Sequence, residues 1–298
     1  MGLATKAIKQ KIKSVNNIKK ITKTMEMVSV AKMKKTTERV TRGRAYSRYA
    51  LELLHHIAGE KHISHPLLEK RKTGKVLVVA ISSSKGLAGS YNVNISKALA
   101  RYKASTKNEI DCITIGKQSE KSARRNSLPI IASFIDFSEK STSEEFLAIR
   151  DMVLKEFEGG EYEAVKILYT EFKTATSYKP FLMQVLPVKE EIYKDMLLSA
   201  GGEQGEYNKE KNLSLYVFEP SEEYVLDSVV RQLLGQAIFH TFLESLASEH
   251  SSRMFAMKNA NDSAKEILDE LTLYYNQVRQ SAITAEIAEI VGGAAAMS

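Results

Sequence analysis

The chain contains few of the residues that interrupt helices or cross-link a fold. Among 298 residues there are five prolines, one cysteine and no tryptophan. The single cysteine, Cys112, excludes an intramolecular disulfide and fits a reducing compartment. No run of about eighteen apolar residues is present, so no segment has the pattern of a membrane-spanning helix. The N-terminus has the composition of an amphipathic targeting helix, but its pattern continues well past presequence length, so we interpret it as structure.

All five prolines lie between residues 66 and 220, which leaves long proline-free stretches at both ends. From Ser221 to about Val291 the only glycine is Gly235. A comb of alternating three- and four-residue steps runs through this stretch, and fourteen of its eighteen positions are apolar. The positions are Leu226, Val229, Leu233, Gln236, His240, Leu243, Ala247, His250, Met254, Met257, Asn261, Ala264, Leu268, Leu271, Tyr275, Val278, Ala282 and Ala285. A mean step of 3.5 residues is the coiled-coil period, so we predict a helix of roughly 105 Å with one face against a partner helix.

A second long helix is predicted from Leu3 to about Ile57, where the only glycine is Gly43. Seven apolar residues in its first half recur at steps of three or four, which predicts one buried helical face. They are Ile8, Ile12, Val15, Ile18, Ile21, Met25 and Val28. Pro66 disfavours a helical conformation in the residue before it, so the helix should end upstream.

Positive charge is concentrated in the N-terminal stretch. Residues 1–44 hold thirteen Lys/Arg against two acidic residues, Glu26 and Glu38. The net charge of this stretch is therefore +11. Because the whole chain has a net charge of +7, the remaining residues together carry −4. A basic arm on a mildly acidic body implies an acidic partner surface: nucleic acid, anionic lipid or an acidic protein face.

The middle of the chain, residues 70–190, has the alternating pattern of a Rossmann-like α/β domain with a mostly parallel sheet. Expected strands cover residues 75–82, 111–116, 130–137, 164–172 and 181–188, and expected helices cover residues 94–102, 117–126 and 143–157. Ser143 is the expected N-cap of the last helix. Residues 190–219 are predicted to be a flexible loop followed by a return strand at residues 213–218.

The order of elements has a geometric consequence. Residues 1–60 and 220–298 pair as a long antiparallel two-helix coiled coil if both helices leave the same side of the domain. Residues after about Gln277 then extend past the N-terminal helix with no partner in the chain. Because apolar residues surround much of this segment, it needs burial inside another protein.

The sequence contains only weak motifs for nucleotide binding, metal binding or catalysis. Gly86 and Gly89 follow a strand and precede a helix but match no nucleotide-binding pattern, so we interpret them as a tight turn. The cluster His55, His56, His62 and His65 brackets a helix end without cysteine or aspartate companions and is not expected to bind metal. Cys112 is expected to be a buried apolar side chain. We predict no catalytic, cofactor-binding or metal-binding residues.

Two alternatives remain open on the residues alone. A coiled-coil protein that uses its basic arm on nucleic acid or a membrane surface predicts binding that collapses with salt, although residues 1–45 hold no aromatic side chain for stacking on bases. A Rossmann-type enzyme with structural arms predicts tight binding of a dinucleotide. Neither alternative provides a covering for the apolar C-terminal segment.

Two stretches at opposite ends carry a resemblance to a known family. They are IKSVNNIKKITKTMEMVSVAKMKK, and LASEHSSRMFAMKNANDSAKEILDELTLYYNQVRQSAITAEIAEIVGGAAA. Both closely resemble the terminal signatures of the γ subunit of F-type ATP synthases. The middle resembles the family loosely, with Gly86-Leu87-Ala88-Gly89 where members often have a Gly-Leu-Cys-Gly turn. The redox insert of chloroplast members is absent, and the resemblance points to a bacterial enzyme.

The resemblance implies a non-catalytic rotor shaft that couples proton-driven rotation of the membrane c-ring to ATP synthesis and hydrolysis on the β subunits. The expected partners are the hexamer of α and β subunits, the ε subunit and the c-ring, with one copy per complex and no nucleic acid. The implied location is the cytoplasmic face of the bacterial cell membrane, as a peripheral protein.

The same resemblance implies which residues contact the α and β subunits. The coupling segment corresponds to Lys20, Lys23, Met25 and Glu26. Polar contacts on the C-terminal helix are expected from Glu249, Arg253, Arg279, Gln280, Thr284 and Glu286. An apolar bearing is expected to hold Ile287, Ile290 and Val291.

Overall fold

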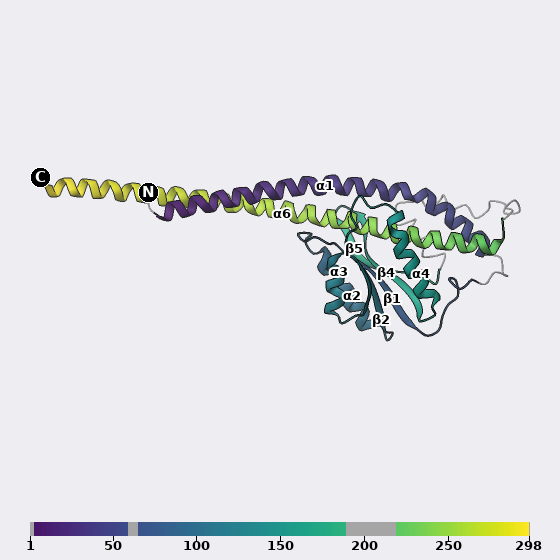
Figure 1. Ribbon diagram of the computed structural model, residues 1–298. Coiled ribbons are helices and arrows are strands. Elements are labelled where there is room, and N and C mark those ends of the chain that lie inside the picture. The colour runs from purple at the N-terminus through teal and green to yellow at the C-terminus, as the bar shows by residue number, and fades with distance from the viewer. Residues whose placement is uncertain (1–2, 59–64, 189–218, 298) are drawn as a thin grey trace. The chain divides into compact units, whose positions relative to one another are not determined.

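The computed structural model describes residues 3–58, 65–188 and 219–297. In chain order its elements are α1 (Leu3–Ala58), β1 (Lys75–Ile81), α2 (Tyr91–Ser105), β2 (Ile110–Ile115), α3 (Lys117–Arg125), β3 (Ile130–Phe134), the 3-10 turn η1 (Glu144–Phe146), α4 (Leu147–Glu158), β4 (Tyr162–Thr174), β5 (Ser177–Leu186) and α6 (Glu222–Met297) (Figure 1). The chain divides into two compact units: residues 1–30 with 253–298, and residues 31–252. The predicted loop and return strand at residues 190–218 lie outside the described residues.

The unit of residues 31–252 is built on a five-stranded sheet in the order β3-β2-β1-β4-β5. β1 pairs in parallel with both β2 and β4, and β2 pairs in parallel with β3. Among the strands that the structure describes, only β5 runs antiparallel, against β4. The predicted mostly parallel sheet is therefore confirmed, and β1 lies at the point where the strand order reverses.

The two faces of this sheet have separate cores. Alternation along β1 sends Leu77 and Val79 to one face and Val76 and Val78 to the other. The first face packs against α4 and the first half of α6, and the second packs against α2 and α3 (Figure 1). Because β1 is buried on both faces from Val76 to Ile81, these six residues are all apolar.

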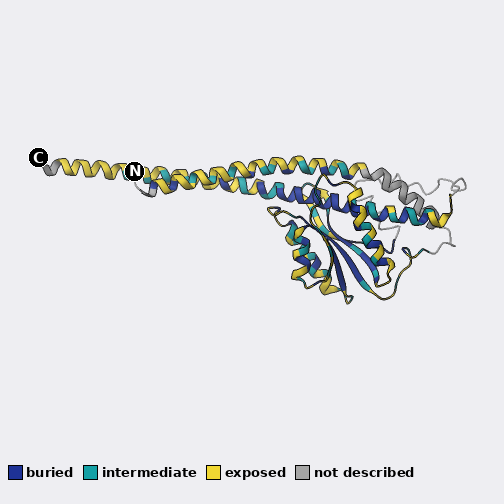
Figure 2. Ribbon diagram, in the orientation of Figure 1, coloured by how far each residue is buried: buried dark blue, intermediate teal, exposed yellow. Residues whose placement is uncertain are grey.

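In the unit of residues 1–30 and 253–298, α1 and α6 run antiparallel side by side and bury one narrow face each (Figures 1 and 2). On α6 the predicted comb is confirmed as far as Ala282, because each of its positions from Met254 is buried or half-buried. From Lys265 onward every residue off the comb is exposed. Ala285, the last predicted position, is exposed.

The predicted face of α1 is confirmed at Ile8, Ile12, Val15 and Met25 but is wrong at its three other positions. The buried or half-buried residues at 3.5-residue spacing are Thr5, Ile8, Ile12, Val15, Lys19, Thr22, Glu26 and Ser29. Ile18, Ile21 and Val28 are 50%, 59% and 48% exposed. Each of these three residues lies one position before a residue of the spaced face, so its side chain falls outside the contact. The buried face of α1 continues instead through polar residues. Their aliphatic carbons pack against the partner helix, while their polar ends reach water or backbone.

Ser143 lies at the N-cap position, as predicted, but its side chain does not cap the helix. The helix begins as the short turn η1, and Ser143 makes no side-chain capping hydrogen bond. Glu145 supplies the side-chain contact instead, since its carboxylate accepts a 2.9 Å hydrogen bond from the backbone N–H of Thr142.

Candidate partner-binding surfaces

The last three turns of α6 are apolar and exposed. Every residue from Ile283 to Ala294 is exposed, in agreement with the predicted segment that has no partner in the chain (Figure 2). Ile287, Ile290 and Val291 expose 55%, 71% and 61% of their surface. Apolar residues gathered on one exposed helix mark a protein contact rather than a solvated end.

Polar residues lie before and among these apolar side chains. Arg279, Gln280, Thr284 and Glu286 are all exposed. Thr284 donates a 3.0 Å hydrogen bond to the backbone carbonyl oxygen of Gln280, and both residues are exposed. A shallow groove follows this face of α6, lined by Gln277, Gln280, Ser281, Thr284, Ala285 and Ala288. The small residues in it leave room for another chain to approach the helix backbone.

The predicted coupling segment of α1 mixes charge with exposed apolar surface. Lys20 and Lys23 are exposed, and Met25 and Glu26 are half-buried. Lys23 pairs with Glu26 at 3.2 Å, one turn along the same helix. Beside them lie the exposed side chains of Ile18, Ile21 and Val28, so this part of α1 offers apolar contacts flanked by lysines.

Glu249 and Arg253 differ from the other predicted contact residues, because each is only 8% exposed. They belong to a stretch of α6, residues 240–253, in which every residue is buried. Several residues of this stretch are polar: Thr241 bonds to the backbone of its own helix, whereas Ser248, Ser251 and Ser252 donate hydrogen bonds to backbone carbonyls of the α/β domain.

α6 occupies the place where an open α/β sheet would bind a ligand. That place is the crevice at the carboxyl ends of the strands where their order reverses, which here is the end of β1. Ser252 donates a 2.7 Å hydrogen bond to the carbonyl oxygen of Ala88 in the loop after β1. At the neighbouring strand β4, Ser248 donates a 3.2 Å hydrogen bond to the carbonyl oxygen of Thr170. The glycine turn after β1 therefore contacts the long helix, a contact that the sequence analysis, which interpreted the glycines as a tight turn, did not predict.

The remaining motifs are structural in the described residues. Cys112 is fully buried in the core beneath α2 and α3, and burial raises the pKa of its thiol to about 12. The side chains of His55, His56 and His62 lie outside the described part of the structure. No group of three or more His, Cys, Asp or Glu side chains among the described residues is arranged to hold a metal ion.

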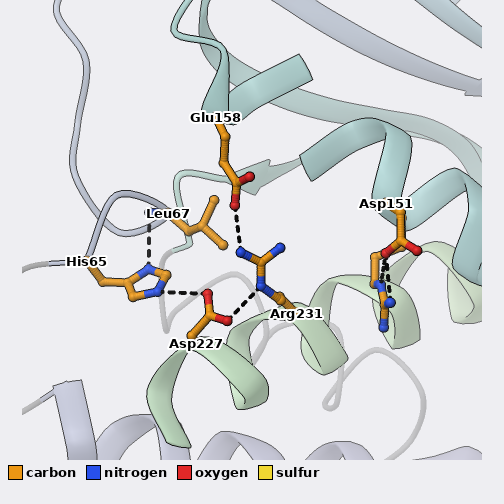
Figure 3. Close-up of polar contacts among 7 residues, drawn as sticks. His65, Leu67, Asp151, Glu158, Asp227 and Arg231 are labelled. Carbon is orange, nitrogen blue, oxygen red and sulfur yellow. Dashed lines mark hydrogen bonds and ion pairs between the residues drawn. The ribbon is translucent and has the colours of Figure 1, made fainter. Parts of the chain in front are cut away.

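His65 belongs to a clasp of polar contacts around the first turns of α6 (Figure 3). The His65 Nδ1 atom accepts a hydrogen bond from the backbone N–H of Leu67, so its Nε2–H faces Asp227 at 3.2 Å. Arg231 donates 2.7 Å hydrogen bonds to Asp227 and to Glu158 at the end of α4. Burial acts to raise the pKa of Asp227, but Arg231 and His65 together hold it below its usual value. Sequence reasoning missed this clasp because its members are up to 166 positions apart (His65 to Arg231).

These features define a class of protein before any comparison: an α/β domain whose ligand crevice is filled by one long helix, α6, and a second unit in which α6 pairs with α1. Among the described helices, none is both long and apolar enough to cross a membrane.

Comparisons with known proteins identify the family. A family model described as ATP synthase matches residues 4–297. The chain is 37% identical to the ATP synthase gamma chain of Dehalococcoides mccartyi strain 195, over 98% of both chains. It is 35% identical to that of Heliobacterium modesticaldum, over 97% of this chain and 98% of the relative. The chain therefore belongs to the ATP synthase gamma-chain family.

Solved structures agree with this assignment. A chain of the central stalk and c-ring structure of the Tetrahymena thermophila mitochondrial ATP synthase matches with a TM-score of 0.58 and 26% identity, over 80% of this chain and 99% of that one. A chain of the Euglena gracilis mitochondrial enzyme shares the fold, with a TM-score of 0.67 and 20% identity, over 99% of this chain and 94% of that one. The chain is thus a rotor stalk subunit, a non-catalytic part of the ATP synthase complex.

Proposed function

We propose that α6 ends inside the hexamer of α and β subunits, with Ile287, Ile290 and Val291 in an apolar bearing. The exposed apolar end of α6 carries this proposal, because these residues have no partner among the described residues of the chain. Apolar contacts suit a bearing because they are weakly directional, so no single rotational angle is strongly favoured. Directional hydrogen bonds at the same place would hold the rotor at one angle.

Torque requires a second kind of contact. Arg279, Gln280, Thr284 and Glu286 supply exposed polar groups just before the bearing, and Lys20, Lys23, Met25 and Glu26 supply a charged and apolar segment on α1. These groups meet β loops, with the lysines facing acidic residues. Glu249 and Arg253 contribute through the small fraction of their surface that is exposed.

The α/β domain and the adjoining parts of α1 and α6 contact the ε subunit and the c-ring in this proposal. The chain is present in one copy and lies on the cytoplasmic face of a bacterial membrane as a peripheral protein. Proton flow turns the ring and the shaft together, and the asymmetry of the shaft drives each β subunit through its binding states in turn.

Co-expression with F-type α and β subunits from one source tests the proposal. We expect one copy of the chain in an α/β hexamer with ATPase activity, and loss of turnover when residues after Gln277 are deleted. Salt-sensitive binding to DNA or liposomes without association with α and β would overturn the shaft proposal and favour a basic-arm protein.

The polar contacts are tested separately. The double variant Gln280→Ala and Thr284→Ala should fold and assemble normally, because both residues are exposed in the isolated chain. It should lower coupled ATP synthesis, because it removes two of the proposed polar contacts to the β subunits. Tyr224→Ser is the matched control, since Tyr224 is 64% exposed but lies at the other end of α6. Unchanged synthesis in the double variant would remove these two residues from the proposed contact.

A further inference from the structure

Two cations of α1 hold the loop between β3 and η1, and we call these contacts the α1 latch. Arg39 donates hydrogen bonds of 2.5 Å and 2.6 Å to the backbone carbonyl oxygens of Glu139 and Ser141. Lys32 pairs with the carboxylate of Glu139 at 2.6 Å. Lys32 and Arg39 are seven positions apart in the sequence, which is about two turns of α1, so both side chains leave the same face of the helix.

The same loop also contacts α6. The guanidinium of Arg39 lies over the ring of Phe239 on α6, 5.5 Å from its centroid. Burial acts to raise the pKa of Glu139, but the hydrogen bond from Lys32 and the charges of Lys32 and His250 on α6 hold it below its usual value. All of these residues belong to the unit of residues 31–252. The loop is therefore a junction of α1, α6 and the α/β domain.

The loop has a shape that its own contacts fix. The backbone N–H of Ser138 donates a 3.2 Å hydrogen bond to the hydroxyl oxygen of Ser141, whose N–H donates a 3.1 Å hydrogen bond to the carbonyl oxygen of Ser138. Phe137, just before the loop, stacks on Phe146 of the core shared with α6, with ring centroids 4.3 Å apart. The two carbonyl oxygens of the latch are thus held at a fixed spacing, which a planar guanidinium with several donors can bridge.

α1 and α6 are attached to the α/β domain by different chemistry. The attachment of α6 uses short neutral side chains of buried serines, such as Ser245 and Ser248. The latch uses long charged side chains, and those of Lys32 and Glu139 are 36% and 25% exposed. Salt screens an ion pair that reaches water. Charge changes can therefore weaken the attachment of α1 while the attachment of α6 stays intact.

The latch lies close in sequence to the predicted coupling segment of α1. α1 is one helix from Leu3 to Ala58. Glu26, the last predicted coupling residue, precedes Lys32 by six positions, which is less than two helical turns. Over so short a distance the helical hydrogen bonds make the backbone stiff, so a rotation or shift of α1 at Lys32 also moves the coupling segment.

We infer that Lys32 and Arg39 are positioning residues for the coupling segment. By holding α1 on the loop of residues 138–141, they fix the rotation of α1 about its own axis and its position along α6. Without the latch, force that β loops apply to α1 would turn or slide this helix instead of reaching the α/β domain. The inference rests on the proposed shaft function, because it gives the latch a part in transmitting torque.

The distance between α1 and the α/β domain tests the latch directly. Spin labels on Lys35→Cys in α1 and Lys155→Cys in α4, two exposed positions, report this distance in the full-length chain by pulsed electron paramagnetic resonance, while buried Cys112 stays unlabelled. We expect one narrow distance distribution in the parent. In the double variant Lys32→Gln and Arg39→Gln we expect it to broaden or shift by about 1–2 Å, the size of helix shifts at interfaces. An unchanged distribution overturns the inference.

The matched control is the double variant Lys34→Gln and Arg42→Gln. It removes the same two charges from exposed positions of α1, where Arg42 pairs with Glu38 of its own helix at 3.8 Å. This control should keep the parent distribution, and so should Lys32→Arg, which keeps the cation. Arg39→Lys should not, because one ammonium group cannot reproduce a forked contact with two carbonyl oxygens. Equal broadening in the control and the latch variant would reject a specific latch.

Coupling in the whole ATP synthase distinguishes a positioning role from a merely structural one. The complex that carries Lys32→Gln and Arg39→Gln is reconstituted in vesicles, and ATP hydrolysis and proton pumping are measured on the same sample. We expect parental assembly and hydrolysis with a loss of protons pumped per ATP. A parental ratio, or a parallel fall of assembly, hydrolysis and pumping, contradicts the positioning role.

Failure of the proposed function gives a different result. If even the unmodified chain does not assemble with α and β subunits, the shaft function is rejected, and with it the role of the latch in torque. The spin-label distances still decide whether Lys32 and Arg39 hold α1 on the loop. If the unmodified chain assembles and pumps normally, only the variants bear on the latch, and the shaft function stands whatever they show.

Discussion

Tyr91 at the start of α2 and Ser245 in the middle of α6 share a 2.6 Å hydrogen bond between their buried hydroxyl groups. Ser245 also accepts a 3.3 Å hydrogen bond from the backbone N–H of Thr170 on β4. One serine of the long helix thus joins a helix and a strand of the α/β domain. Because serine is small, this part of α6 approaches the sheet closely, and the two hydrogen bonds fix its position on the α/β domain.

Tyr91→Phe should weaken this joint without removing the aromatic ring. Tyr91 is 1% exposed, so the change deletes a buried hydrogen bond and lowers the free energy of unfolding by about 1 kcal/mol. Denaturant unfolding of the chain measures the difference. Tyr274→Phe is the control, because Tyr274 is 54% exposed and its change should stay within about 0.5 kcal/mol. Equal effects at both positions would contradict a structural role for the Tyr91 hydroxyl.

Gly116→Ala should be severely destabilising. Gly116 has a φ of 95°, and an added Cβ would lie 2.2 Å from the backbone oxygen of Ser82. Neither backbone segment can move without disturbing the ends of β1 and β2, so we expect a loss of about 3 kcal/mol or more. At Gly86 an added Cβ meets nothing within 4 Å, which makes Gly86→Ala the matched control. Circular dichroism during thermal unfolding distinguishes the two variants, and similar melting temperatures would disprove the steric argument.

Asp227→Asn should alter the acid stability of the chain. The pKa of Asp227 is lower in the folded state than in the unfolded state, where it is about 3.9. The ionised side chain therefore contributes to the free energy of unfolding above the unfolded-state pKa, and this contribution is lost as pH falls through the folded-state pKa. Because the side chain is 39% exposed, the contribution is discounted for solvent screening to about 0.5–1 kcal/mol.

The expected signature is a stability difference between the parent and the Asn variant that is constant above about pH 5 and disappears in stronger acid. Urea unfolding at a series of pH values measures it. Asp269→Asn, at an exposed position of α6, should show no such difference. A difference that grows as pH falls would have the wrong sign for this mechanism.

Cys112 should be unreactive in the folded chain. Burial raises the pKa of its thiol to about 12, so at pH 8 only about one molecule in ten thousand carries the thiolate, and the side chain is fully buried. Alkylation by iodoacetamide at pH 8, followed by mass spectrometry, should label the chain only after denaturation. Modification of the native chain at the rate of a free thiol would show that the core opens readily.

The long helices show where sequence reasoning succeeds and where it fails. On α6 the 3.5-residue comb predicted the contact face correctly through to Ala282, because apolar and small residues fill it regularly. On α1 the prediction included Ile18, Ile21 and Val28 because they are apolar, although these residues are exposed and the buried face lies one position further along the chain. Residues such as Lys19 and Thr22 occupy that face, and polar residues at a helix contact give no periodic apolar signal.

The candidate contact residues show the same division. The exposed apolar end of α6 followed from the sequence, because no partner in the chain was long enough to cover it. The burial of Glu249 and Arg253 did not, since a charged residue in a sequence predicts exposure. The predicted domain boundaries, and the contacts to α, β, ε and the c-ring, stay predictions.

The sequence by itself determined the two long helices, the α/β pattern between them and the family to which the chain belongs, because these rest on local periodicity and on contiguous motifs. Only the tertiary structure decided that α6 fills the crevice at the end of β1, that His65 reaches Asp227, and that Lys32 and Arg39 reach the loop of residues 138–141. Each of these joins residues far apart in the chain. Such contacts depend on how strands are ordered and helices packed, and no local pattern of residues encodes them.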